Sequence, residues 1–315
     1  MFEEDNNLYG LFDTHCDTVS KAYEGEKQLF NNNLQLDFKK LLEYNAPVQF
    51  FAIWLSKKFY VDAYAETVKR INYYYEQVEK NKDIFAHANS YSDIVENKKN
   101  GKISGILSIE GGEALEGKIE NLYTLHNMGV RAITLTWNHK NEIANGAAEP
   151  MGGLTDFGRE VVTEMENLGM FIDVSHLNDD SFWEVARMAS KPFIASHSNS
   201  RKITNVRRNL TDAQMKAVAQ NGGVIGINLC PTFLSNRNYA DISDVMLHID
   251  HMIKVVGCDY IGFGCDFDGI DDTPRDINDV SHINKLISAL DKKYGSSVAA
   301  KISEENFLRL LCNNS

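Results

Sequence analysis

Short apolar runs alternate along this chain with longer segments of helical periodicity. The runs are seven to nine residues long and nearly continuously apolar, which is typical of strands covered on both faces in a parallel sheet. Eight of them have strand character: residues 9–15, 48–55, 103–110, 130–137, 170–176, 192–198, 223–229 and 260–268.

Most of the intervening segments place apolar residues at helical spacing. Residues 62–87 predict one long amphipathic helix, and residues 155–170 begin with a Thr in the N-cap position and close on a Gly. Further helices are predicted over 179–190, 211–223, 243–257 and, at the end of the chain, 301–315. The alternation, without a break in composition, predicts a (β/α)8 TIM barrel in a single domain over residues 1–315. The strand count alone leaves a doubly wound open sheet as the alternative.

Composition narrows the class of protein. The 315 residues are 43% hydrophobic and 24% charged, as in ordinary globular proteins. A net charge of −12 argues against a nucleic-acid partner or an anionic membrane surface, because both are bound through basic patches. The 5 Cys lack any C-x-x-C pair and indicate reduced thiols.

No targeting signal is evident in the sequence. Residues 1–10 are acidic and lack the basic and apolar regions of a signal peptide. No run approaches 18 apolar residues, so no transmembrane span is predicted. We therefore expect a cytoplasmic protein without membrane attachment.

Unusual polar residues follow the predicted strands, at the end where barrel enzymes carry their active sites. The residues in these positions are His15, Asp17, Glu110, His176, His197, Asp266 and Asp268. Because strand side chains alternate between faces, His15 and Asp17 are expected to point the same way, as are Asp266 and Asp268.

This combination favours a metal centre. A lone His after a strand, or a lone Asp-Gly, is usually structural. The recurrence of both types at several strand ends indicates a shared site, and imidazole with carboxylate is a normal ligand set for zinc in a hydrolytic centre.

The chain resembles the membrane dipeptidase family (renal dipeptidase-like, peptidase family M19). The resemblance spans about residues 10–270. The matching blocks occur in the family's order: "DTHCD", "SIEGGEAL", "AITLTWN", "GLTDFGREVV", "GMFIDVSH", "IASHSNSR", "RRNLTD" and "GFGCDFDG".

This resemblance implies a barrel that holds two zinc ions, although the ligand types suit other divalent ions as well. His15 and Asp17 would bind one ion, His176 and His197 the other, and Glu110 would bridge them. Asp266 matches the family's catalytic acid/base, and a hydroxide bridging the ions would attack the peptide carbonyl. The family also suggests a homodimer.

Two further positions concern the substrate. Arg208 matches a residue that contacts substrate, and we expect it to grip the terminal carboxylate. The family members best characterised carry a substrate-binding His directly after "TLT", where this chain has Trp137. His139 has the same strand parity and is the expected substitute.

We therefore expect a zinc-dependent dipeptidase, with the possibility of a C-terminal D-residue in its substrates. Two alternatives remain from the sequence. One is another amidohydrolase-type hydrolase on the same scaffold, acting on lactones or N-acyl amino acids. The other is a metal-stabilised protein that binds peptides without cleaving them, which an intact Asp266 argues against.

Overall fold

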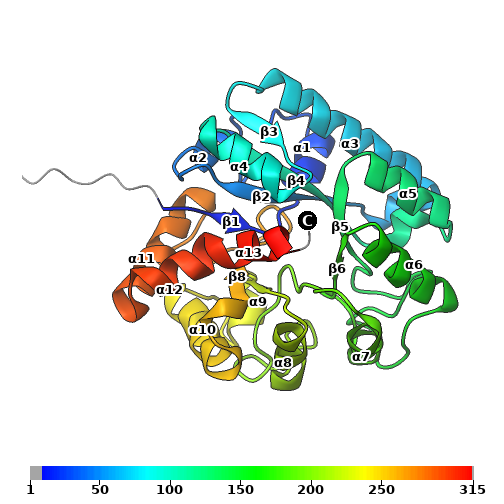
Figure 1. Ribbon diagram of the computed structural model, residues 1–315. Helices are drawn as coiled ribbons and strands as arrows, with labels where there is room; N and C mark the ends of the chain where they lie inside the picture. The colour runs from blue at the N-terminus through cyan, green and yellow to red at the C-terminus, as the bar shows by residue number, and fades with distance from the viewer. Residues whose placement is uncertain (1–8, 314–315) are drawn as a thin grey trace, which may run out of the picture.

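The computed structural model describes residues 9–313, and its centre is one parallel sheet curled into a barrel (Figure 1). The neighbouring strands follow the order β6-β5-β4-β2-β1-β8-β7, and β3 pairs with β4. The strands are β1 (Phe12–Asp13), β2 (Val48–Trp54), β3 (Phe85–His87), β4 (Ile103–Glu110), β5 (Val130–Thr134), β6 (Phe171–Asp173), β7 (Ile225–Ile227) and β8 (Ile261–Phe263). The predicted TIM-barrel fold class is confirmed.

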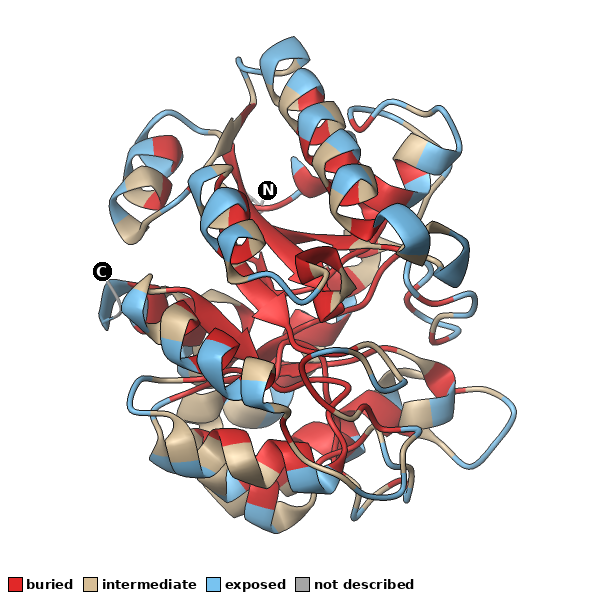
Figure 2. Cartoon of the chain, turned by 90° about the vertical axis from the view of Figure 1, so that its right-hand side faces the viewer, coloured by how far each residue is buried: buried red, intermediate tan, exposed pale blue. Residues whose placement is uncertain are grey.

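Helices surround the strands, and their inward faces are buried against the sheet (Figure 2). They are α1 (Thr18–Glu24), α2 (Phe38–Leu41), α3 (Ala63–Lys80), α4 (Tyr91–Lys99), α5 (Ile119–Asn127), α6 (Asp156–Asn167), α7 (Asp179–Met188), α8 (Asp212–Gln220), α9 (Pro231–Leu234), α10 (Ile242–Val256), α11 (Ile283–Tyr294), α12 (Ser296–Ala300) and α13 (Asn306–Asn313). No helix among the described residues is both long and apolar enough to cross a membrane.

Local sequence signals account for several of these boundaries. The predicted Thr N-cap of α6 is confirmed, since the Thr155 hydroxyl accepts a hydrogen bond from the Gly158 amide. Thr211 and Gln214 form a capping box at the start of α8. Every residue of β4 is buried, as its continuous apolar run predicts for a strand covered on both faces.

The predicted helix over 62–87 is wrong at its end. The helix stops at Lys80, and Phe85–His87 form β3 against the first residues of β4. The Phe85 ring is fully buried and stacks on Phe38 with the ring centroids 4.2 Å apart. Tertiary pairing therefore overrides the helical pattern at this point.

The run at 192–198 lies where the pattern predicts a strand but forms only isolated bridges. Ile194 bridges Asp173 of β6, and Ala195 bridges Ile225 of β7, so this segment closes the barrel between those two strands. Gly226 and Gly264 allow the backbone of this segment to approach β7 and the residues after β8 closely. A Cβ at Gly226 or Gly264 would lie 2.0 Å or 1.7 Å from the Ser196 carbonyl oxygen.

An apolar cluster seals the end of the barrel at which the strands begin. Phe12 and Phe50, which lie on β1 and β2, meet Phe307 and Leu310 of α13 in this cluster. The Phe12 and Phe307 rings stack with centroids 5.3 Å apart, and α13 lies across the barrel axis in Figure 1. With the strand beginnings sealed, the polar residues are confined to the opposite end of the barrel.

Candidate metal centre and active site

The predicted ligand residues meet at the carboxyl ends of the strands. Glu110 is the last residue of β4, His15 follows β1 by two positions, and His176 follows β6 by three. His197 follows the segment that bridges β6 and β7. All four side chains are buried, together with those of Asp17 and Asp266.

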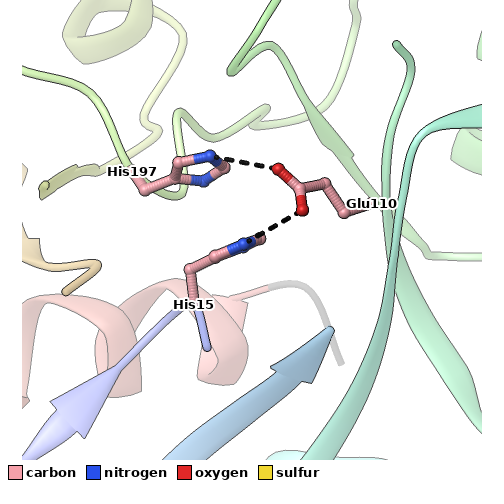
Figure 3. A group of neighbouring side chains, drawn as sticks. All are labelled: His15, Glu110 and His197. Carbon is pink, nitrogen blue, oxygen red and sulfur yellow. Dashed lines mark ion pairs between the residues drawn. The ribbon is translucent and has the colours of Figure 1, made fainter. Parts of the chain in front are cut away.

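Glu110 lies at the centre of this group. Its Oε2 is 3.6 Å from His15 Nε2, and its Oε1 is 2.9 Å from His176 Nε2 and 3.5 Å from His197 Nε2. Figure 3 shows the two carboxylate oxygens turned toward different histidines. A carboxylate with each oxygen facing separate ligands is suited to lie between two cations.

His15 is surrounded by carboxylates that do not hydrogen-bond to it. Its Nε2 lies 3.7 Å from Asp17 Oδ2 and 3.8 Å from Asp266 Oδ1, beyond hydrogen-bonding range. Both His15 Nε2 and Asp17 Oδ1 are buried without any hydrogen-bond partner. Buried polar atoms are rarely left unsatisfied, so these two atoms fit a site that binds a cation.

The other two histidines present lone pairs to the same space. His197 Nδ1 lies 2.7 Å from Ser196 Oγ, and that hydroxyl donates its proton to Asp173 Oδ2 at 2.5 Å. The hydroxyl oxygen therefore accepts from the Nδ1–H of His197, which leaves Nε2 of that ring unprotonated.

His176 has the same tautomer for a similar reason. Its Nδ1 lies 2.9 Å from Asn138 Oδ1, an oxygen that can only accept. The Nε2 atoms of His176 and His197 are 2.9 Å apart, with Glu110 Oε1 beside them. Two facing lone pairs and a carboxylate oxygen repel one another unless a cation lies among them. The donor set therefore fits a divalent metal centre.

Burial sets the protonation states of Glu110, Asp266, His176 and His197, whereas the carboxylates of Glu110 and Asp17 raise the pKa of His15 well above its ordinary value despite burial. It raises the pKa of Glu110 to about 8, with Asp17 adding to the effect, and raises the pKa of Asp266 to about 6. Burial also lowers the pKa of His176 and of His197 well below the ordinary value. The two imidazoles are thus neutral, which is the form that binds metal.

Ligand atoms gather in two overlapping sets whose members lie within 4.8 Å of one another. One set is His15, Glu110 and His197, and the other is His15, Asp17 and Asp266. His15 belongs to both sets. Because Asp266 belongs to the same set as Asp17, a cation bound there would act directly on the Asp266 carboxylate.

A cavity of about 1100 Å³ opens above this centre. Its floor and walls include Asp17, Trp54, Glu110, Trp137, Asn138, His176 and Asp266. The Trp54 and Trp137 rings meet edge to face with centroids 5.4 Å apart and form an aromatic wall. The cavity is large enough for a small peptide with sizeable side chains.

Two backbone conformations at the site are unusual. His176 has φ of +68° and Asp266 has φ of +65°, in the left-handed region that residues with a Cβ seldom occupy. Such strain persists where the surroundings determine the geometry, and it is concentrated at functional sites.

A positive φ also makes the predicted strand alternation of Asp266 and Asp268 wrong. Asp268 has φ of +67°, so the chain after β8 turns instead of continuing as a strand. Asp268 accepts hydrogen bonds from the Thr18 hydroxyl and the Gln35 amide, and it tethers that loop instead of joining the ligand cluster.

The two predicted substrate-binding residues have different surroundings. The Arg208 guanidinium lies 5.3 Å from the ring centroid of Phe233 and donates to the His197 carbonyl oxygen at 3.3 Å, so it lies behind Phe233, which lines the cavity, and is not itself among the lining residues. Its Nε is buried without a partner, and no carboxylate of the described residues forms an ion pair with it. Burial lowers the pKa of Arg208, while the nearby carboxylates of Asp266 and Glu110 act in the opposite direction.

His139 is not brought to the cavity. Its side chain is 52% exposed and faces Glu149, with Nδ1 and Oε1 3.4 Å apart. Trp137 and Asn138 occupy the cavity wall instead.

Sequence reasoning missed the residues that orient the histidines. Asp173 accepts hydrogen bonds from Thr134, Ser175 and Ser196 deep in the barrel. The Ser196 hydroxyl that is fixed in this way then holds His197 Nδ1. Asp173 lies within the quoted block "GMFIDVSH", three residues before His176, but its partners Thr134 and Ser196 are 39 and 23 positions away and only the fold reveals them.

Replacing Ser196 with Ala is expected to weaken metal binding by about 10–100-fold, because His197 loses the acceptor that fixes its tautomer. The measurement is a competition titration of the apoprotein with Zn²⁺ and a chromophoric chelator. Ser198→Ala is the matched control, since Ser198 lies in the same buried loop and its hydroxyl reaches only Ser175, at 3.5 Å. Equal affinities in the two variants would contradict the role of Ser196.

Comparison with known proteins shows which family this chain resembles. The family model for membrane dipeptidases (peptidase family M19) matches residues 7–314. An uncharacterized protein of the pqqA 5′ region of Klebsiella pneumoniae is 34% identical over 236 residues, which are 71% of this chain and 87% of that protein. An uncharacterized dipeptidase of Schizosaccharomyces pombe is 36% identical over 197 residues, which are 60% of this chain and 47% of that longer protein.

Solved structures show the same architecture. A crystal structure of dipeptidase AC, a metallopeptidase of family M19, superposes with a TM-score of 0.90 at 26% identity, covering 96% of this chain and 98% of the other. A Rhodobacter sphaeroides metallopeptidase, liganded with a phosphinate mimic of L-Ala-D-Ala, gives 0.88 at 24% identity and covers 98% and 100%. With the family model spanning almost the whole sequence, this chain belongs to the membrane dipeptidase family, peptidase family M19.

Proposed function

We propose that this metallo-dipeptidase hydrolyses dipeptides with two zinc ions held by His15, Asp17, Glu110, His176 and His197. The observation that supports this most directly is the pair of unprotonated Nε2 atoms, 2.9 Å apart, that face Glu110 Oε1. Nitrogen with carboxylate oxygen is the donor set that zinc takes in hydrolytic centres.

Two such ions would lower the pKa of a bound water towards neutrality and would polarise the carbonyl of the peptide bond. The protein's own groups then have to move a proton and hold the substrate. Carboxylates from Asp17, Glu110 and Asp266 offset the positive charge of the ions, and the barrel holds them in place before substrate arrives.

Asp266 is the proposed proton carrier. Its Oδ2 accepts a hydrogen bond from Asn228 Nδ2 at 2.9 Å, which fixes the carboxylate and leaves Oδ1 facing His15 and the cavity. A proton taken up at Oδ1 from the attacking water can be delivered to the peptide nitrogen as the C–N bond breaks.

Arg208 is the proposed anchor for the substrate carboxylate. Its guanidinium is held beneath Phe233 and against the His197 carbonyl, which positions a cation beside the metal centre. The planar guanidinium pairs with a carboxylate through two hydrogen bonds and so selects a substrate with a free C-terminus.

The proposal is tested by release of free amino acid from a dipeptide panel, comparing zinc-loaded with chelator-treated protein. The panel holds L-L dipeptides, L-Ala–D-Ala, an N-acyl amino acid and a lactone. Metal-dependent cleavage of dipeptides, but not of the other two, is the expected result. Cleavage only of lactone or acyl amino acid would reassign the activity, and binding without turnover would indicate a peptide-binding protein.

Asp266→Asn is expected to keep the zinc content of the wild type and to lower kcat by about 10²–10⁴-fold, because the proton carrier is lost. Asp271→Asn is the matched control, as Asp271 is exposed at the cavity rim and the charge change is the same. Zinc content and steady-state rates are measured on both variants. A kcat for Asp266→Asn equal to that of the control would remove Asp266 from its role.

Arg208→Ala is expected to raise KM for dipeptides by about 10–100-fold, the loss of one charge-assisted bidentate contact, with a smaller change in kcat. The diagnostic measurement uses C-terminally amidated dipeptides, on which wild type and variant should differ little. An equal loss on free and amidated substrates would contradict a carboxylate contact.

A further inference from the structure

Asn138 lies between a proposed metal ligand and the cavity. Its Oδ1 is 2.9 Å from His176 Nδ1, and the residue also lines the cavity wall. Its amide nitrogen Nδ2 makes no hydrogen bond within residues 9–313 and is not among the buried unpaired atoms, so it retains accessible surface. The side chain thus has one occupied end and one free end.

The orientation of this amide follows from the histidine. For His176 Nε2 to carry a lone pair into the site, Nδ1 must carry the proton, and only the oxygen of the amide can accept it. The nitrogen is therefore the end left for the cavity. Flipping the amide would set two donors against each other and would break the contact.

The backbone holds Asn138 and His176 in one unit. The Asn138 carbonyl accepts a hydrogen bond from the Ala148 amide at 2.8 Å, and the His176 carbonyl accepts one from the adjacent Ala147 amide at 2.7 Å. Gly146 lies so close that an added Cβ would be 2.6 Å from the Asn138 carbonyl oxygen. The donor at Nδ2 is thereby fixed before any substrate binds.

The wall beside Asn138 is aromatic and leaves the donor unpaired. The Trp137 ring centroid lies 6.4 Å from that of His176, and the Trp54 ring packs edge to face against Trp137. A free N–H directed into a cavity beside a cationic centre matches an oxygen that gains negative charge during reaction, as the carbonyl oxygen of a peptide does.

We propose that Asn138 has two roles: Oδ1 holds His176 in its metal-binding tautomer, and Nδ2 donates a hydrogen bond to the carbonyl oxygen of the bond being cleaved. The second role rests on the proposed dipeptidase function, whereas the first depends only on metal binding. Asn138 is accordingly a positioning residue through one atom and a catalytic residue through the other.

Two substitutions separate the roles. Asn138→Asp keeps an oxygen for His176 Nδ1–H but removes the donor. It should bind Zn²⁺ at least as tightly as wild type while kcat falls by about 10²–10³-fold. Asn138→Ala removes both groups, so zinc affinity should also fall by about 10–100-fold.

Zinc affinity is measured by chelator competition, and Co²⁺-loaded protein provides a spectroscopic signature. The visible bands of bound Co²⁺ should shift in Asn138→Ala, where the imidazole is released, and stay in place in Asn138→Asp. Asn238→Asp adds the same charge to the cavity wall without touching a histidine and measures the effect of charge alone. Thermal unfolding of each apoprotein confirms that the variants are folded.

Equal zinc affinities and equal Co²⁺ spectra in Asn138→Ala and wild type would overturn the positioning role. A kcat for Asn138→Asp equal to that of Asn238→Asp would overturn the donor role. If wild-type protein cleaves no dipeptide, the proposed function fails by itself, and the zinc and Co²⁺ measurements still decide the positioning role.

Discussion

The structure depends on a group of buried carboxylates gathered around His15, whose pKa they raise well above its ordinary value. Asp17, Glu110 and Asp266 lie together out of water, and no Lys or Arg of the described chain forms an ion pair with any of them. Burying carboxylates without a partner is costly, and it raises the pKa of Glu110 to about 8. A divalent cation reverses that cost, since it attracts the charged carboxylates and the neutral imidazoles at once. The fold therefore gathers carboxylates and imidazoles in an arrangement that suits a divalent cation.

The barrel makes this arrangement possible by separating its two ends. Aromatic residues and α13 seal the end where the strands begin, so polar groups can be concentrated where they finish. Between the two ends of the barrel, Asp173 accepts four hydrogen bonds. Two of them hold Ser196, whose hydroxyl in turn orients the His197 ring. Gly226 and Gly264 leave room for the Ser196 carbonyl, and any larger side chain there would displace the segment that carries His197. Packing deep in the barrel thus determines where the imidazole points.

Sequence patterns predicted the barrel and the convergence of His15, Glu110, His176 and His197 because each of these residues terminates an apolar run. Such a signal is local, and a parallel barrel brings all its strand ends to one face. The roles of these residues as zinc ligands remain predictions. The predictions were wrong where contacts between distant parts of the chain determine the local structure. Phe85–His87 lie at the end of a helical pattern but pair with β4, and the turn after β8 directs Asp268 away from the site. His139 satisfies the expected parity, yet residues after Thr134 no longer belong to β5 and alternation stops applying.

The same limit explains why the sequence did not suggest Asn138. Its importance comes from one contact across 38 positions of the chain, to a ring whose protonation state fixes which atom of the amide reaches the cavity. Neither the spacing nor the residue type carries that information. Where Trp137 stands in place of an expected histidine, the adjacent amide provides the hydrogen-bond donor, and the indole adds an apolar surface beside it. The metal-binding half of the cavity is thus determined by the strands, whereas the loop between β5 and α6 determines which substrate oxygen and which side chain meet it.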